Sequence, residues 1–140
     1  MHHESISTDD VARTLAKFDI LATAQRVDIA QVLLGHGGHF SADEIFALVN
    51  ENGPRVSKAT VYNTLGLFSE RGLLRQVIVD PARVFYDVNT TPHHHFFDCD
   101  TGKLTDIMED QMTISGIPAL PEGSSLDRVD VIVRVRRPAA

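Results

Sequence analysis

This chain of 140 residues is poor in cysteine, tryptophan and long apolar runs. Its single cysteine, Cys99, cannot form an internal disulfide, and it excludes the cysteine-rich class of zinc sites. No stretch approaches the ~20 apolar residues that span a membrane, and the N-terminal residues lack an apolar signal core. We therefore expect a cytoplasmic protein with no membrane partner, folded as one domain or two small ones.

Positive charge is also scarce, with 13 Lys and Arg residues against 19 Asp and Glu residues and a formal net charge of −6. An acidic balance argues at first against nucleic acid, because contacts to phosphate dominate DNA affinity. The local distribution of charge weakens this argument against a nucleic-acid partner. Within residues 54–75 the basic side chains Arg55, Lys58, Arg71 and Arg75 stand against one acidic residue. The sequence therefore predicts one basic segment in an acidic chain.

Four helices are predicted in the first part of the chain, where apolar residues recur at helical spacing behind polar N-caps. The predicted N-caps are Ser7 or Thr8, Thr23, Ser41 and Ser57. Glu44 completes a capping box with Ser41. Glycine readily takes the left-handed conformation that stops a helix. The predicted stops of the last three helices are Gly35, Gly53 and Gly72.

A β-hairpin is predicted after the helices, with strands over 73–79 and 83–87 joined by a turn at Asp80-Pro81. Helices followed by a two-stranded ribbon indicate a winged helix-turn-helix. In such a fold the helix before the ribbon enters the major groove of DNA. We therefore expect a winged-helix DNA-binding domain over 1–88.

The turn-rich segment 89–92 predicts a hinge between two units. Beyond it, alternating and β-branched residues predict strands over 93–98, 103–107 and 129–136. Three strands in so short a segment cannot form an independent core, which predicts pairing with a second copy in a two-fold dimer. The expected fold class is α+β, with a small α/β dimerisation domain over 93–140.

The helix behind Ser57 presents polar residues opposite its apolar stripe. Lys58 can neutralise a phosphate, Tyr62 can pack on a thymine methyl or donate to phosphate, and Asn63 can contact a base edge. Ala59 faces the same side. The alternative is a solvated face with one half-buried tyrosine. The hairpin that follows and the local basic charge favour a DNA-reading helix.

The run His93-His94-His95 lies in a predicted strand. Side chains alternate between the two faces of a strand, so His93 and His95 should point to one side and His94 to the other. Two imidazoles on one face make half of a metal site with nitrogen and oxygen ligands.

His39 and Asp87 are the candidate partners of His93 and His95. Such a set of three histidines and one aspartate suits Zn²⁺, Mn²⁺ or Fe²⁺, and it would tie the two halves of the chain together across the hinge. Taken alone, His39 is more typical of an ordinary loop histidine. A hydrolytic metal site, and with it a small metallohydrolase, is a weaker alternative, because four protein ligands leave no open position for water.

Taken together, these residues resemble the ferric uptake regulator superfamily over about residues 10–110. The motifs that fall in the family's order are Thr23-Ala24-Gln25-Arg26, His39-Phe40-Ser41-Ala42-Asp43-Glu44, Ala59-Thr60-Val61-Tyr62-Asn63-Thr64-Leu65, Gly72-Leu73, Tyr86-Asp87 and the histidine run. Within the superfamily, His93 to Phe97 and the closing Val129 to Arg137 are most similar to the iron response regulator branch.

The resemblance implies a homodimeric, metal-responsive transcription regulator of iron homeostasis genes, a repressor or activator rather than an enzyme. It implies a divalent metal at His39, Asp87, His93 and His95 and an operator in double-stranded DNA. The DNA contacts that it implies are Lys58, Ala59, Thr60, Tyr62, Asn63 and Arg26. In the iron response branch the triplet is associated with heme, which makes His93, His94 and His95 candidate heme ligands. Heme or a heme-delivering protein is then a partner, and a direct heme sensor without divalent metal is the alternative function.

The sequence departs from the family at several positions. Where the family has Cys-x-x-Cys, this chain has Asp98-Cys99-Asp100-Thr101. We therefore do not expect the family's structural zinc site, which has four cysteine ligands, in this chain. No histidine follows His95, so the family's other regulatory metal site lacks ligands. Leu21-Ala22 also lacks the basic side chain that many relatives place in the minor groove.

Overall fold

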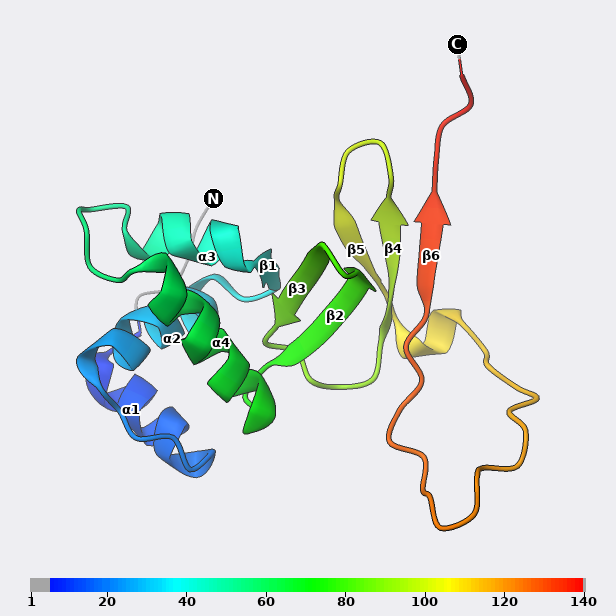
Figure 1. The fold of residues 1–140 in the computed structure, drawn as a ribbon, viewed down its shortest axis with the longest axis horizontal. Coiled ribbons are helices and arrows are strands. Elements are labelled where there is room, and N and C mark those ends of the chain that lie inside the picture. The colour runs from blue at the N-terminus through cyan, green and yellow to red at the C-terminus, as the bar shows by residue number, and fades with distance from the viewer. Residues whose placement is uncertain (1–5, 140) are drawn as a thin grey trace. The chain divides into compact units, whose positions relative to one another are not determined.

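The structure is a computed structural model that describes residues 6–139 (Figure 1). The chain divides between Thr90 and Thr91 into two compact units, which we call the N-terminal unit and the C-terminal unit. Within the described residues no helix combines the length and apolar character needed to cross a membrane.

Four α-helices form most of the N-terminal unit: α1 (Thr8–Lys17), α2 (Ala24–His36), α3 (Ala42–Val49) and α4 (Lys58–Glu70). A predicted N-cap precedes each helix and accepts a hydrogen bond from a backbone N–H of its first turn. These confirmed caps are Ser7, Thr23, Ser41 and Ser57. Each such cap stabilises a helix by about 1 kcal/mol, so local sequence sets where these helices begin.

The glycines predicted to stop the helices lie near the helix ends but do not set all of them. Gly35 stays inside α2, and Gly37, with a φ of 68°, is the C-cap of that helix. Helix α3 already ends at Val49. The side-chain oxygen of Asn50 accepts hydrogen bonds from two backbone N–H groups of the following loop, at 2.7 and 2.9 Å, and so replaces the helical pattern. Gly72, with a φ of 86°, follows the C-cap of α4.

A three-stranded antiparallel sheet completes the N-terminal unit, in the order β1-β3-β2. Its strands are β1 (His39–Ser41), β2 (Arg75–Asp80) and β3 (Arg83–Asp87). The sequence did not predict β1, because three residues are too few to show an alternating pattern. Helix α4 packs its predicted stripe of Val61, Leu65 and Phe68 into the core, each 0% exposed. The helices and the β2–β3 hairpin confirm the predicted winged helix.

The C-terminal unit is a second three-stranded sheet, in the order β5-β4-β6. Its strands are β4 (His94–Asp98), β5 (Leu104–Ile107) and β6 (Ile132–Val135). Strand β5 runs antiparallel to β4, and β6 runs parallel to it. The helical content of this unit is a single 3₁₀ turn, Glu109–Gln111, among the described residues. A long irregular loop then leads back to β6 (Figure 1).

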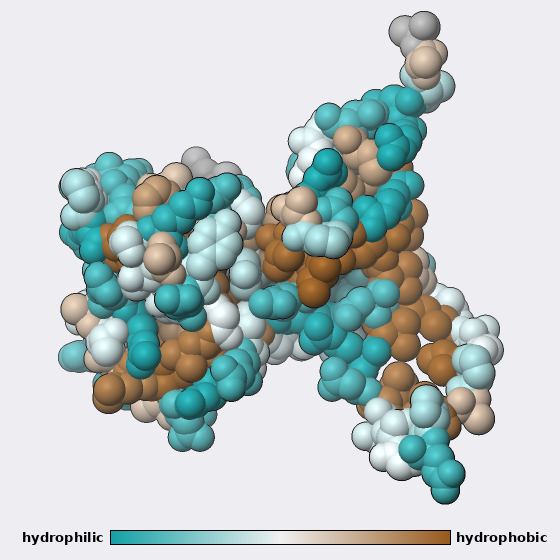
Figure 2. Space-filling model, in the orientation of Figure 1, coloured by the Kyte–Doolittle hydropathy of each residue, from teal (hydrophilic) through white to brown (hydrophobic). Residues whose placement is uncertain are grey.

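The core of the C-terminal unit is small. Its buried apolar residues, among those the structure describes, are Phe97, Leu104 and Ile107. Other apolar side chains reach the surface of this unit, as the brown areas of Figure 2 show, and they include Phe96, Ile117, Leu120, Leu126 and Val135. A core of this size supports the expectation that this half pairs with a second copy.

Candidate metal centre and DNA-reading helix

The histidine triplet, which begins one residue before β4, alternates between the two faces of the strand, as the sequence predicts. The rings of His93 and His95 lie side by side with their centroids 4.6 Å apart. His94 points to the other face, where its Nδ1 accepts a hydrogen bond from the Val131 N–H at 3.1 Å. The triplet therefore contains one pair of candidate metal ligands, His93 and His95, while His94 is hydrogen-bonded to Val131 on the other face.

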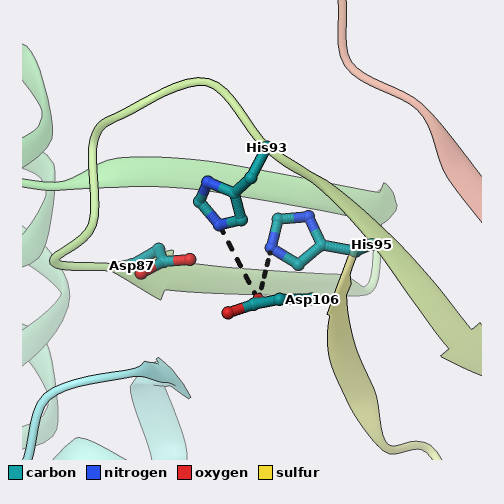
Figure 3. A group of neighbouring side chains, drawn as sticks. All are labelled: Asp87, His93, His95 and Asp106. Atoms are coloured by element: carbon teal, nitrogen blue, oxygen red, sulfur yellow. Dashed lines mark ion pairs between the residues drawn. The ribbon is translucent and has the colours of Figure 1, made fainter. Parts of the chain in front are cut away.

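Asp106 of β5 is the third member of the histidine site (Figure 3). In the β4–β5 ladder Asp106 lies opposite His95. Its Oδ1 is 3.3 Å from Nε2 of His95 and 3.7 Å from Nε2 of His93. The ligand atoms of these three residues all lie within 4.8 Å of one another.

Sequence reasoning missed Asp106, although a signal for it was present. Asp100-Thr101-Gly102 is a turn between two predicted strands, so those strands form a hairpin. In a hairpin the residue opposite His95 must lie near Asp106, and opposite residues share one face of the sheet. Following the predicted hairpin to its partner residues would have added this carboxylate to the ligand set.

The donor chemistry of the three side chains fits a divalent metal ion. The Nδ1 atom of His93 lies 2.7 Å from the Thr91 carbonyl oxygen. A carbonyl can only accept, so Nδ1 carries the proton and Nε2, which faces Asp106, carries the lone pair. His93 and His95 are each only 2% exposed. Two buried imidazole nitrogens and a carboxylate oxygen form a ligand set that suits Zn²⁺, Mn²⁺ or Fe²⁺.

The other two predicted ligands, His39 and Asp87, are neighbours in the sheet of the N-terminal unit. Strand β1 pairs with β3 so that His39 lies opposite Asp87. On the other side of β3, Arg75 of β2 occupies the same row, opposite Asp87. The Asp87 side chain is 1% exposed, and its Oδ1 accepts a hydrogen bond from the Asn89 N–H at 2.9 Å. The unpredicted strand β1 is therefore what brings His39 to Asp87.

Helix α4 presents the predicted DNA-reading residues outward. Lys58, Ala59 and Asn63 are exposed, and Tyr62 is 47% exposed. Thr60 is half-buried, and its side-chain oxygen accepts a hydrogen bond from the Ser57 hydroxyl at 3.0 Å. The outward face of α4 therefore carries a cation, a methyl group, an amide and a phenol in reach of a ligand.

A hollow of about 410 Å³ lies between the start of α2 and the outward face of α4. It is lined by Thr23, Gln25, Arg26, Thr60, Asn63, Thr64 and Leu67. The structure thus brings predicted Arg26 next to predicted Asn63 and Thr60. It also adds Gln25, an exposed amide that sequence reasoning left without a role, to the same surface.

The basic character of this region is weaker at the surface than the sequence count suggests. Arg75 is 7% exposed within β2. The Lys58 Nζ lies 3.2 Å from Oδ1 of Asp43, and Arg55 lies 3.7 Å from Oδ1 of Asp28. A carboxylate therefore lies beside each of these two exposed cations and offsets part of its positive charge.

The sequence of this chain matches a known protein family. The model of the ferric uptake regulator family matches residues 17–116. The chain belongs to the ferric uptake regulator family. Proteins of this family are metal-responsive transcription regulators rather than enzymes, which agrees with the expectation from the sequence.

Individual relatives agree with this membership. The peroxide-responsive repressor of Staphylococcus epidermidis is 30% identical over 99 residues, which make up 71% of this chain and 66% of that protein. The ferric uptake regulator of Pseudomonas aeruginosa with manganese superposes with a TM-score of 0.69 at 24% identity, covering 91% of this chain and 97% of that one. The ferric uptake regulator of Francisella tularensis with iron gives a TM-score of 0.70 at 20% identity, covering 86% and 93%. At these identities the two structures show that the fold is shared.

Proposed function

We propose that this member of the ferric uptake regulator family is a homodimeric regulator that binds operator DNA in response to a divalent metal and controls genes of iron homeostasis. The observation that carries the proposal is the cluster of buried His93 and His95 with the exposed Asp106, whose ligand atoms lie within 4.8 Å of one another. A buried pair of imidazoles that faces a carboxylate is a typical ligand arrangement for a divalent metal ion. A cytoplasmic location belongs to the same proposal, since the operator DNA would lie there.

The proposed ligand set is His39, Asp87, His93, His95 and Asp106. Each unit supplies a preformed part of it: His39 lies opposite Asp87 in one sheet, and His95 lies opposite Asp106 in the other. The short segment 88–92 links the two parts in sequence. The carboxylates of Asp87 and Asp106 would balance the charge of a divalent ion. Relatives described with manganese and with iron support Mn²⁺ and Fe²⁺ as candidates beside Zn²⁺.

Ligands that come from both units would make metal affinity depend on how the units are placed. A metal ion would therefore shift the population toward the placement that satisfies all its ligands. In a two-fold dimer this would fix the spacing between two copies of α4, and so the spacing of the half-sites that the dimer can bind. Metal binding would thus favour DNA binding without touching the DNA.

The DNA contacts would come from the outward face of α4 and the start of α2. In this proposal Lys58 and Arg26 bind phosphate, while Tyr62 and Asn63 contact base edges in the major groove. Ala59 and Thr60 complete the surface. Gln25 lines the same hollow as Asn63, so it joins the candidate base contacts.

A double substitution tests this function. His93→Ala with His95→Ala should weaken Mn²⁺ binding and metal-dependent DNA binding together, because both buried nitrogen ligands are lost. Metal stoichiometry can be measured by elemental analysis, and DNA binding by a mobility-shift titration with and without Mn²⁺. An unchanged stoichiometry in the double variant would contradict the assignment. The matched control is His36→Ala, since His36 lies in α2, outside the proposed ligand set.

The contacts of the triplet favour this function over direct heme sensing. The Nδ1 of His94 accepts from the Val131 N–H, so the neutral ring carries its proton on Nε2. A heme iron would need that Nε2 lone pair, and binding it would cost the contact with Val131. Heme titration of the metal-free protein tests the alternative: a Soret band that depends on His94 would support it.

A further inference from the structure

Strand β6 lies at the edge of its sheet and makes few stabilising contacts. It consists of Ile132–Val135 and follows the irregular loop after the 3₁₀ turn. Its strand neighbour is β4, with which it pairs in parallel. The docking of β6 therefore depends on its few contacts with β4 and with the turn that follows β4.

The start of β6 is anchored to the histidine triplet. The N–H of Val131 donates to Nδ1 of His94 at 3.1 Å. The carbonyl of the same Val131 accepts from the N–H of His95 at 3.2 Å. The backbone N–H and the carbonyl of Val131 are thus hydrogen-bonded to His94 and His95, respectively. His95 is also a proposed metal ligand.

The far end of β6 is anchored by a separate set of contacts. The N–H of Cys99 donates to the Val135 carbonyl at 2.9 Å. The Arg137 guanidinium pairs with Asp98 and lies 3.7 Å from Asp100, and the N–H of Arg137 donates to Asp100 at 2.8 Å. Asp98 is the last residue of β4, and Cys99 and Asp100 belong to the turn that follows it.

We propose that His94 is a positioning residue that couples metal occupancy at His93 and His95 to the docking of β6. The inference rests on the proposed function, because it requires a metal at that site. A metal ion bound by His93 and His95 would fix the backbone on both sides of His94. The imidazole of His94 and the N–H of His95 would then be held where Val131 needs them.

A docked β6 also shapes the surface that a second copy would meet. In the β4–β6 ladder Phe96 lies opposite Val133, and opposite residues share a face. Phe96 is 41% exposed and Val135 is 36% exposed. The small core of the C-terminal unit makes a second copy the expected cover of this apolar face. Metal-linked docking of β6 would therefore also tighten the dimer.

Hydrogen exchange of the full-length protein tests this coupling, followed by mass spectrometry of peptides that cover residues 129–136. In the wild-type protein we expect saturating Mn²⁺ to slow exchange in these peptides about tenfold, within the usual range of coupling between two sites. His94→Leu keeps the volume of the side chain but has no acceptor. It should still bind Mn²⁺ and should lose the metal-dependent slowing.

Two further variants separate the coupling from a general loss of structure. His94→Asn restores an acceptor near the position of Nδ1, so it should recover most of the metal-dependent slowing. Arg137→Met loosens the far end of β6 and should speed exchange with and without Mn²⁺, while leaving the metal-dependent difference in place. Analytical ultracentrifugation measures the dissociation constant of the dimer. We expect Mn²⁺ to lower this constant in the variants that keep the metal-dependent slowing of exchange, and to leave it unchanged in His94→Leu.

The outcomes distinguish this inference from the proposed function. A wild-type protein that binds none of Mn²⁺, Fe²⁺ and Zn²⁺ would overturn both. A wild-type protein that binds Mn²⁺ without slower exchange at residues 129–136 would overturn the coupling alone. So would a His94→Leu variant that binds Mn²⁺ and keeps the full slowing.

Discussion

Asp106 is the residue whose substitution tests the metal centre most sharply, because sequence reasoning did not select it. Its Oδ1 lies 3.3 and 3.7 Å from the Nε2 atoms of His95 and His93. Asp106→Asn keeps the shape of the side chain and removes its charge. The change therefore removes an anionic ligand while leaving both imidazoles in place.

The expected loss of affinity follows from what the carboxylate contributes. Losing a partner that only orients a metal ligand typically weakens metal binding 10–100-fold. A direct anionic ligand should matter at least as much, although the Asp106 side chain is 38% exposed and water screens part of its charge. We therefore expect Asp106→Asn to weaken Mn²⁺ binding by about 10–100-fold, or roughly 1.4–2.7 kcal/mol.

A competition titration against a chromophoric chelator measures this affinity directly. The matched control is Asp110→Asn, which removes the charge of an exposed aspartate in the nearby 3₁₀ turn. Thermal unfolding without metal should be similar for both variants and the wild type. If Asp106→Asn binds Mn²⁺ within twofold of the wild type while the control does the same, Asp106 is not a ligand and the geometric argument fails.

Two further predictions concern the DNA surface and the C-terminal anchor. Tyr62→Ala should weaken operator binding by about 1–3 kcal/mol, the typical value of one base contact, without unfolding the protein; equal affinity in a mobility-shift titration would contradict this. The hydrogen bond from Arg137 lowers the pKa of Asp98 below its ordinary value of 3.8. A lowered folded pKa means that this pair stabilises the fold above about pH 4 and stops doing so as the pH falls through the folded pKa. Arg137→Met should raise the Asp98 pKa in a carboxyl NMR titration, and an unchanged pKa would show that the pair does not form.

Local sequence predicted the helices of the N-terminal unit well because their determinants are local. An N-cap such as Ser41 and its box partner Glu44 act within one turn, so their pattern is visible in a short window. The helix stops were less accurate, because Asn50 ends α3 through bonds to a loop that the sequence pattern does not reveal. Strand β1 was missed for a similar reason: it exists because β3 pairs with it.

The proposed metal site also combines features that local sequence reveals with features that only the fold reveals. The sequence by itself determined that His93 and His95 share a face, since alternation along a strand is a property of the backbone. It also determined the N-cap of α4 and the family to which the chain belongs. Only the tertiary structure decided that Asp106 faces the two histidines, that His39 lies beside Asp87, and that His94 holds Val131. Each of these contacts joins strands that lie apart in the chain, and their partners are set by pairing register and packing rather than by local sequence.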